Sequence, residues 1–565
     1  MAVLYDTNHK LRERAATCLA DDFKHNAIET AQETFYNKRG ALVRAVPEWQ
    51  DLRACAAAIR EQVTQNLDYY VAEFVRNAQA QGARVHLAPT GEDALCAVLD
   101  IFEEHNAASC VKSKSMMTEE IGLNETLEEA SIKVVETDCA ENILQTAGDR
   151  PSHIVVPALH HNRDAIAEIY RSKGYTGSNV PEEITHFLRS YLRTEFLTAD
   201  IGIRGCNFAV AETGSVTLVT NEGNGRMVDT CPPVQIVFVG IDRIVPTLES
   251  LDVMMALLPR SAVGAKITTY FSVDQGARRT DELDGPATVH YIVMDNGRSS
   301  LLGTDFQPML RCIRCGACLN ICPVYRHITG HGYGSIYPGP MGVVMTCCLE
   351  GYDNVDSLPM ACTLCAACDD DCPMEVPLHS LIRKHRIQKV QQGKASKAEA
   401  PLFATVSAVL SDSTAYRMVM PAGRFGMKAL ARSGVVGKSI EATREKRKLD
   451  VVIPAGGVLS DNTTWVPILK NWTSCRNMDL MAPQLFRDWF YETHDTCACG
   501  CACDGEHGES GEHGVRGEDG SAVGDTVAAG TPQDIAEAAA AIARRAAGSI
   551  GAVLQNVTPQ EGGQK

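Results

Sequence analysis

The stretch Cys312-Ile-Arg-Cys315-Gly-Ala-Cys318-Leu-Asn-Ile-Cys322-Pro323 recurs 50 residues later as Cys362-Thr-Leu-Cys365-Ala-Ala-Cys368-Asp-Asp-Asp-Cys372-Pro373. This spacing is typical of bacterial ferredoxins, in which three close thiolates bind one 4Fe-4S cluster and the fourth, before proline, binds its neighbour. The pattern therefore predicts two 4Fe-4S clusters and a role in electron transfer. The predicted ligands are Cys312, Cys315, Cys318 and Cys372 for the first cluster and Cys362, Cys365, Cys368 and Cys322 for the second.

Structural zinc and disulfide bonds are the alternative interpretations of these cysteines. Zinc ribbons rarely place four cysteines in this spacing before a proline, and here the pattern occurs twice. Small residues beside the cysteines leave room for backbone amides to approach the sulfides, where hydrogen bonds tune the reduction potential. These residues are Gly316, Ala317, Ala366 and Ala367.

Length and composition narrow the class of protein. A chain of 565 residues is too long for one hydrophobic core, so several domains are expected. No apolar run approaches the roughly 18 residues that span a bilayer, and the N-terminus lacks a signal-peptide core. We therefore expect a protein that does not span the membrane and lies in the cytoplasm. In that reducing compartment its 22 cysteines would stay reduced. The net charge of −17 disfavours nucleic acid as a ligand.

Hydrophobic periodicity divides the chain into five predicted regions. Short apolar runs alternate with helical stretches over residues 76–300, which predicts an α/β domain with a largely parallel sheet. The other regions are a helical segment over 1–75, an α-helical ferredoxin-type domain over 301–380, a helical to irregular region over 381–495, and a flexible acidic tail over 496–565. The tail is rich in glycine, cysteine and histidine, with one short helix expected from Pro532 to about Ala547.

Individual elements can be predicted inside the α/β region. The runs between Phe208 and Val219 are strand-like and meet at Thr213-Gly214. The predicted strands are Arg84–Ala88, Ile132–Val135, His153–Val156 and Val234–Val239, and the predicted helices are Gly91–His105 and Asn162–Ser172.

Further motifs extend from the cysteine region, Gln307–Gly342, through most of the chain. They are Val111-Lys-Ser-Lys-Ser115, Glu119-Glu-Ile-Gly-Leu-Asn-Glu125, Val134-Val-Glu-Thr-Asp138, Pro151-Ser-His-Ile-Val-Val-Pro157, Ala211-Glu-Thr-Gly-Ser215, Arg278-Arg-Thr-Asp-Glu-Leu-Asp-Gly-Pro286 and Phe486-Arg-Asp-Trp489. Over about residues 10 to 490 the sequence resembles the lactate utilisation protein B family, the iron–sulfur subunit of an L-lactate oxidation complex.

The resemblance implies an α/β lactate-utilisation domain with a fold similar to sugar-phosphate isomerases and CoA transferases. It also implies two partners, a cysteine-rich subunit with C-C-G-type motifs and a smaller subunit with a second lactate-utilisation domain. Together the three would oxidise L-lactate to pyruvate. The chain departs from the family in its tail after residue 495 and at Cys347-Cys348, which are either spare ligands or buried small hydrophobes.

Oxidation of a 2-hydroxy acid removes two electrons, whereas a cubane cluster ordinarily passes one. A flavin or a special metal centre usually divides the pair, yet the sequence has no flavin or NAD motif. The glycines of Gly330-His-Gly-Tyr-Gly334 lack the G-x-G-x-x-G spacing and follow a cysteine loop rather than a strand. We therefore expect lactate oxidation at a partner, or at a site shared with one.

Two features of the α/β domain are candidates for chemistry. Lys112 and Lys114 lie near a predicted helix start, where they could bind a carboxylate as a substrate or anion site, or form a solvated charge pair. Glu212 precedes Thr213-Gly214 and resembles the functional carboxylate of related transferase folds, which makes it the candidate catalytic residue. A turn residue that caps a strand is the alternative for Glu212.

Other polar groups have two interpretations each. Arg278, Arg279 and Asp281 form either an anion clamp or an internal salt-bridge cluster. The histidines are general bases or satisfied structural residues; they are His153, His160, His161 and His290. The tail cysteines either bind an additional zinc, copper(I) or iron ion or belong to a flexible segment without metal; they are Cys497, Cys499, Cys501 and Cys503.

Three functions fit this sequence. The first is an electron-transfer subunit of a lactate-oxidising complex, an oxidoreductase component that works only with its partners. Its electron acceptor is left open among a quinone, a flavoprotein and a ferredoxin. The second is a self-sufficient 2-hydroxy-acid dehydrogenase with its active site in the α/β domain. The third is a scaffold whose clusters sense redox state.

Overall fold

The computed structural model describes residues 4–355, 357–394 and 400–432, with a few isolated positions between 458 and 492. These residues belong to two units, one within 1–394 and the other within 395–525. The predicted tail, including its helix near Pro532, lies outside the described residues. Among the described helices, none is both long and apolar enough to cross a bilayer.

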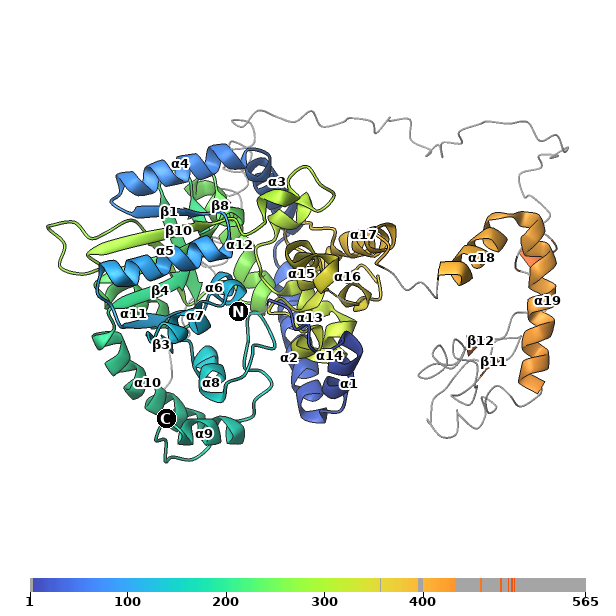
Figure 1. Cartoon of the computed structure of the whole chain (residues 1–565), viewed down its shortest axis with the longest axis horizontal. Helices are drawn as coiled ribbons and strands as arrows, with labels where there is room; N and C mark the ends of the chain where they lie inside the picture. The colour runs from blue at the N-terminus through green and yellow to red at the C-terminus, as the bar shows by residue number, and fades with distance from the viewer. Residues whose placement is uncertain are drawn as a thin grey trace, which may run out of the picture. The chain divides into compact units, whose positions relative to one another are not determined.

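A six-stranded parallel sheet forms the centre of the first unit (Figure 1). Its strands, in spatial order, are β1 (Arg84–Ala88), β10 (Thr288–Met294), β7 (Val234–Gly240), β4 (Ile201–Gly205), β2 (Ser109–Lys112) and β3 (Lys133–Glu136). Every neighbouring pair is parallel. The predicted α/β class with a parallel sheet is confirmed, and the fully buried β7 has the continuous apolar run expected of a central strand.

Different helices cover the two faces of this sheet, because successive strand residues point to opposite faces. Ile236 and Phe238 of β7 share a core with helices α5 (Gly91–Glu104), α6 (Met116–Ile121) and α7 (Leu123–Glu129). Val237 and Val239 pack on the other face with α4 (Leu67–Ala80). Val111 of β2 also lies on that face and packs with α8 (Cys139–Ala147), α9 (Arg163–Arg171) and α10 (Pro181–Thr198).

A smaller sheet adjoins the first. It has the order β8 (Ile244–Val245), β5 (Phe208–Val210), β6 (Ser215–Thr220) and β9 (Tyr270–Asp274). Strands β5 and β6 form the hairpin expected from the two apolar runs. Gly214 closes the turn with a φ of +67°, a value that glycine adopts without steric cost.

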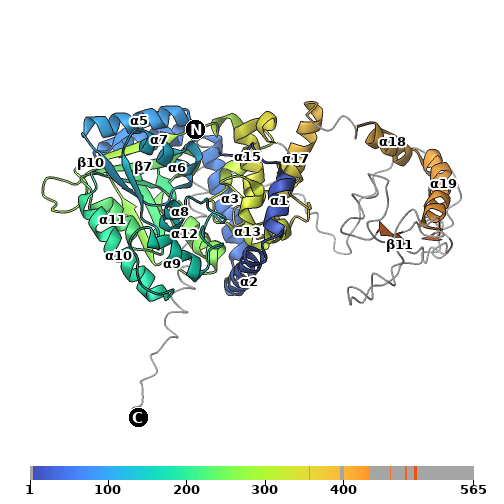
Figure 2. The same cartoon turned by 60° about the horizontal axis from the view of Figure 1, so that its bottom comes forward.

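The cysteine region and the N-terminal helices share one hydrophobic core, although some 250 residues separate them in sequence. In Figures 1 and 2 the N-terminal helices α1 and α2, in blue, lie beside the yellow helices of the cysteine region. The helices on the N-terminal side are α1 (Leu11–Leu19), α2 (Asp22–Arg44) and α3 (Trp49–Gln65). Those on the other side are α13 (Ala317–Ile321), α14 (Pro323–Tyr333), α15 (Gly339–Asn354), α16 (Ala367–Asp371) and α17 (Leu378–Gln391), with α12 (Leu248–Val263) packed against both.

One predicted strand is wrong. Residues 153–156 form a loop, in which Nδ1 of the buried His153 accepts hydrogen bonds from the backbone amides of Val155 at 3.0 Å and Val156 at 3.2 Å. The imidazole thus satisfies two amides that a neighbouring strand would otherwise bind.

The second unit contains the helices α18 (Ala400–Ser411) and α19 (Ser413–Arg432). Its only described strands, β11 (Val458–Leu459) and β12 (Met478–Asp479), pair antiparallel.

Candidate functional site

The two cysteine loops have the same backbone conformation. Arg314 and Leu364 occupy equivalent positions and have φ of +56° and +57°. The amide of Arg314 donates to Sγ of Cys312 at 3.4 Å, and that of Leu364 donates to Sγ of Cys362 at 3.3 Å. Left-handed residues also follow the second cysteine of each loop, and the short helices α13 and α16 start there. The repeat in sequence is therefore a repeat in structure, with amide-to-sulfur hydrogen bonds in both copies.

The fourth cysteine of each loop lies with the other loop. Cys315 interacts electrostatically with Cys312 and with Cys372, whose amide-bound sulfur comes from the second loop. Cys368 likewise interacts with Cys322 and Cys362. Cys372 thus lies near Cys312 and Cys315, and Cys322 lies near Cys362 and Cys368, whereas Cys318 neighbours Cys368 as well as Cys312 and Cys315.

The spacing of these thiols bears on the zinc and disulfide alternatives. The eight cysteines are free of disulfide bonds. In the described part of the chain, no three of them bring their Sγ atoms within 4.8 Å of one another. A tetrahedral zinc ion with Zn–S bonds of about 2.3 Å would hold its sulfurs roughly 3.8 Å apart. The described thiols therefore do not have the close spacing of a zinc site.

Residues from the N-terminal helices bind the segments that carry Cys322 and Cys372, the fourth cysteine of each loop. Arg53 donates from Nε to the carbonyl oxygen of Cys372 at 2.9 Å. Arg39 pairs with Asp371 at 2.6 Å, and Gln32 donates to the carbonyl oxygen of Leu319 at 2.6 Å. Sequence analysis did not identify these three side chains. The only local signal was a polar residue on the otherwise apolar face of an amphipathic helix.

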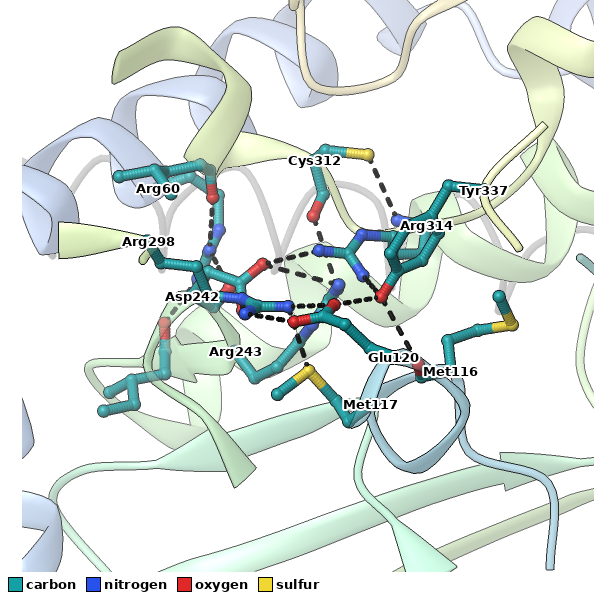
Figure 3. Close-up of polar contacts among 12 residues, drawn as sticks. Arg60, Met116, Met117, Glu120, Asp242, Arg243, Arg298, Cys312, Arg314 and Tyr337 are labelled. Carbon is teal, nitrogen blue, oxygen red and sulfur yellow. Dashed lines mark hydrogen bonds and ion pairs between the residues drawn. The ribbon is translucent and has the colours of Figure 1, made fainter. Parts of the chain in front are cut away.

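A buried ion-pair network joins the first cysteine loop to the parallel sheet (Figure 3). Asp242, just after β7, lies 3.1 Å from Arg298, 3.2 Å from Arg314 and 3.5 Å from Arg243. Burial acts to raise the pKa of Asp242, but the charges of these arginines outweigh it and hold that pKa well below its usual range. The carboxylate of Asp242 is therefore ionised at neutral pH.

Glu120 of α6 completes the network (Figure 3). It pairs with Arg298 at 2.8 Å and accepts a hydrogen bond from the Tyr337 hydroxyl at 2.7 Å. Within the described residues, Arg60 of α3 donates to main-chain carbonyl oxygens, including that of Leu310 at 2.8 Å. Four arginines, namely Arg60, Arg243, Arg298 and Arg314, thus face two carboxylates, those of Asp242 and Glu120.

The excess of two positive charges lies against the first cysteine group. Arg243 donates from Nη1 to the carbonyl oxygen of Cys312 at 3.3 Å. A buried charge without a counter-charge is costly. Four thiolates with their iron and sulfide carry net negative charge, so a cluster on this loop would balance the arginines. The donor set and its surroundings fit a 4Fe-4S cluster.

A cavity of about 340 Å³ lies between the sheet and the same loop. Its wall includes Ser113–Ser115 after β2, Gly205–Asn207 after β4, and Ile313–Cys315 of the first loop. Ligands of parallel α/β sheets bind at this carboxyl edge of the strands. The charged residues of the wall are Lys114, Asp138, Glu222, Arg243 and Arg314.

The two candidate lysines have different places. Lys114 lines the cavity, and its Nζ pairs with Glu141 at 2.8 Å. Lys112 is fully buried, and its Nζ pairs with Glu136 at 2.5 Å and Glu119 at 2.9 Å. The prediction of Lys112 as an anion-binding or solvated residue is therefore corrected, because two carboxylates of its own chain already surround it.

Glu212 lies on the surface and outside the cavity. Its Oε1 accepts a hydrogen bond from the backbone amide of Leu248 at 2.7 Å, the first residue of α12. Glu212 thus caps the start of helix α12, not a strand as the alternative interpretation expected.

The remaining candidates are dispersed. Arg278, Arg279 and Asp281 lie exposed on one loop, and no ion pair joins them within the described residues. His290 is hydrogen-bonded to His86 at 2.9 Å in the sheet. Cys348 lies 3.7 Å from the His385 ring, and burial raises the pKa of its thiol to about 12. The tail cysteines Cys497, Cys499, Cys501 and Cys503 lie outside the described residues.

Comparison with known proteins gives two domain matches. Residues 71–294 match the LUD domain, and residues 308–376 match the 4Fe-4S dicluster domain. "Lactate utilization protein B" of Lysinibacillus sphaericus is 47% identical over 415 residues, which are 73% of this chain and 87% of that protein. "Lactate utilization protein B 1" of Bacillus mycoides is 42% identical over 485 residues, 86% of this chain and 96% of that protein. A crystal structure of a DUF162 family protein from Deinococcus radiodurans aligns with 40% of this chain and 98% of its own, at 15% identity and a TM-score of 0.24.

Proposed function

The chain belongs to the lactate utilization protein B family, and from that premise we propose that it is the electron-transfer subunit of a complex that oxidises L-lactate to pyruvate. The observation that carries the proposal is the repeated cysteine loop whose fourth cysteine lies with the other repeat. When bound, two 4Fe-4S clusters would supply one-electron transfer.

The chain's own residues would position and balance these groups. Cys312, Cys315, Cys318 and Cys372 would hold the first cluster, and Cys362, Cys365, Cys368 and Cys322 the second. The amides of Arg314 and Leu364 donate to cysteine sulfurs, and such bonds stabilise the more negative, reduced state. The expected partners are a cysteine-rich C-C-G-type subunit and a smaller subunit with a second LUD domain, in the reducing cytoplasm that so many free thiols favour.

Iron and sulfide analysis of the anaerobically reconstituted chain tests the cluster proposal. We expect about eight irons per chain, because each cubane contains four. Cys315→Ser and Cys365→Ser should each lower the iron content by about half, whereas Cys96→Ser, at an exposed cysteine of α5, should leave it unchanged. Four irons or fewer in the unmodified chain would remove the basis of the proposal.

Partner dependence tests the role in the complex. Lactate should bleach the visible absorbance of the clusters only when both partner subunits are present. Omission of one partner at a time is the control, and the clusters should then keep their absorbance. Lactate oxidation requires a group that divides an electron pair, and we expect this group on a partner.

A second function is favoured by the cavity beside Cys315. Lys114, Arg243 and Arg314 provide positive charge in its wall, so a 2-hydroxy acid could bind there and make the chain a self-sufficient dehydrogenase. Lactate would then bleach the isolated chain, and Lys114→Gln would abolish the bleaching. Glu212→Gln is the matched variant outside the cavity; loss of bleaching in it would instead assign the chemistry to Glu212.

A further inference from the structure

Three potential metal ligands meet at a place that neither cysteine group includes. Asp149, His160 and His331 each bring one ligand atom to within 4.8 Å of the other two. Asp149 and His160 come from the loop between α8 and α9, and His331 comes from the end of α14. The rings of His160 and His331 lie 4.5 Å apart, nearly perpendicular to each other.

The hydrogen bonds around His160 fix where its proton lies. The Ser152 hydroxyl donates to the carbonyl oxygen of Pro157 at 3.1 Å. The Ser152 oxygen therefore accepts from Nδ1 of His160, 2.9 Å away. Neutral His160 then has its lone pair on Nε2, which lies 2.9 Å from Oδ2 of Asp149. Two acceptor atoms thus face each other, and such a pair is stable only with a cation between or beside them.

His331 presents a third lone pair. Its Nε2 lies 2.9 Å from the carbonyl oxygen of Arg150, which can only accept, so Nε2 carries the proton. Nδ1 of the neutral ring is then the unprotonated nitrogen. A proton on His160 would satisfy the pair with Asp149 alone, whereas a metal ion satisfies all three acceptors at once.

These surroundings resemble the outer contacts of known metal sites. Ligand histidines usually donate their second N–H to a carbonyl or hydroxyl oxygen, as His160 and His331 do here. His161 lies 3.1 Å from the same Asp149 oxygen and orients the carboxylate. Ligands about 2.1 Å from an ion are roughly 3.0 to 3.4 Å from one another, close to the observed separation of Asp149 and His160.

The site borders a cavity. The His160 side chain is 1% exposed, whereas Asp149 and His331 line a cavity of about 540 Å³. Two histidines, one carboxylate and open positions are the ligand set of non-haem iron(II) sites and, with water, of catalytic zinc sites.

We propose that Asp149, His160 and His331 bind one divalent first-row transition ion, zinc or iron(II), whose open positions face this cavity and accept oxygen ligands. The site is separate from the cysteine groups. Helix α14 begins directly after Cys322, has a kink at Thr329 with a φ of +54°, and carries His331 near its other end.

A second cluster of two histidines and one carboxylate offers the matched control. Glu104, His105 and His290 also bring their ligand atoms within 4.8 Å. There Glu104 is already paired with Arg84, and His290 is hydrogen-bonded to His86 at 2.9 Å. We therefore expect no ion at that cluster.

Metal analysis of the full chain, purified without air and with its iron–sulfur groups, tests the proposal. If the ion is zinc, we expect about one zinc per chain with nitrogen and oxygen ligands at about 2.0 to 2.1 Å in X-ray absorption and no sulfur at about 2.3 Å. If it is iron, Mössbauer spectra should contain a high-spin ferrous component of about one iron, distinct from cubane iron.

Asp149→Asn and His331→Gln should remove that signal, and His105→Gln should retain it. The visible absorbance of the cysteine-bound iron reports whether each variant is folded and loaded. Zinc bound through sulfur, equal metal content in Asp149→Asn and the unmodified chain, or no ion beyond the cubane iron would each overturn the proposal.

Discussion

Arg314 of the first cysteine loop lies 3.2 Å from Asp242, measured from Nη2 to Oδ2, and this ion pair joins the loop to the segment after the central strand β7. Both side chains are buried. The pair thus links the iron–sulfur region directly to the LUD domain.

Arg314→Gln should lower the reduction potential of the first cluster, because the reduced state would lose a nearby positive charge. One unit charge at about 8 Å and an effective dielectric constant of about 20 is worth ~2 kcal/mol, which corresponds to roughly 50–100 mV for one electron. Redox titration followed by EPR measures the change. Arg386→Gln is the control, because Arg386 donates to the Cys362 carbonyl oxygen at 2.6 Å and should affect the second cluster alone. Equal shifts in both variants would contradict the prediction.

Gly316→Val should destabilise the first loop, whereas its counterpart Ala366 already tolerates a side chain. The φ of Gly316 is +80°, and a Cβ there would lie 3.1 Å from Val155. A β-branched residue at this φ is strained, so we expect a loss of about 1–3 kcal/mol in the free energy of unfolding. Ala366→Gly should change it by less than about 1 kcal/mol. Urea unfolding and iron content of both variants check the difference.

Arg53→Met should lower the free energy of unfolding by about 1.5–3 kcal/mol, the usual range for a hydrogen bond made by a charged group. The change leaves the carbonyl oxygen of Cys372 without its buried donor. The urea midpoint measures the loss. Arg76→Met, at an exposed arginine of α4, should alter it by no more than about 0.5 kcal/mol.

Glu141→Gln should remove a pH-dependent part of the stability. Burial raises the pKa of Glu141 to about 7, although Lys114 lies nearby. A carboxyl whose pKa is higher in the folded state favours folding at low pH, and this contribution is lost as pH rises from about 4.5 to about 7.

The free energy of unfolding of the unmodified chain should therefore decline over this interval by a few kcal/mol more than that of the variant. Urea unfolding at several pH values measures both curves. Glu128→Gln, at an exposed position of α7, should retain the decline, and parallel curves for Glu141→Gln and the unmodified chain would contradict the prediction.

The sequence by itself determined the features that depend on local spacing. The cysteine repeat indicated two loops of one kind, since three ligands within seven residues leave few alternatives. Apolar runs alternating with helical periods indicated the parallel sheet, and Thr213-Gly214 indicated the hairpin between β5 and β6. Each of these patterns is formed by residues close together in the chain.

Tertiary structure alone decided where the charges lie. Lys112 and Lys114 lie two residues apart in one sequence motif. Lys112 is nevertheless surrounded by Glu119 and Glu136, whereas Lys114 lines a cavity. Whether a charged side chain is buried depends on which opposite charges distant segments bring to it, because an unpaired charge cannot leave water at low cost. The meeting of Arg60, Asp242 and Arg314 at one point, from three separate segments, therefore followed from packing and not from any local pattern.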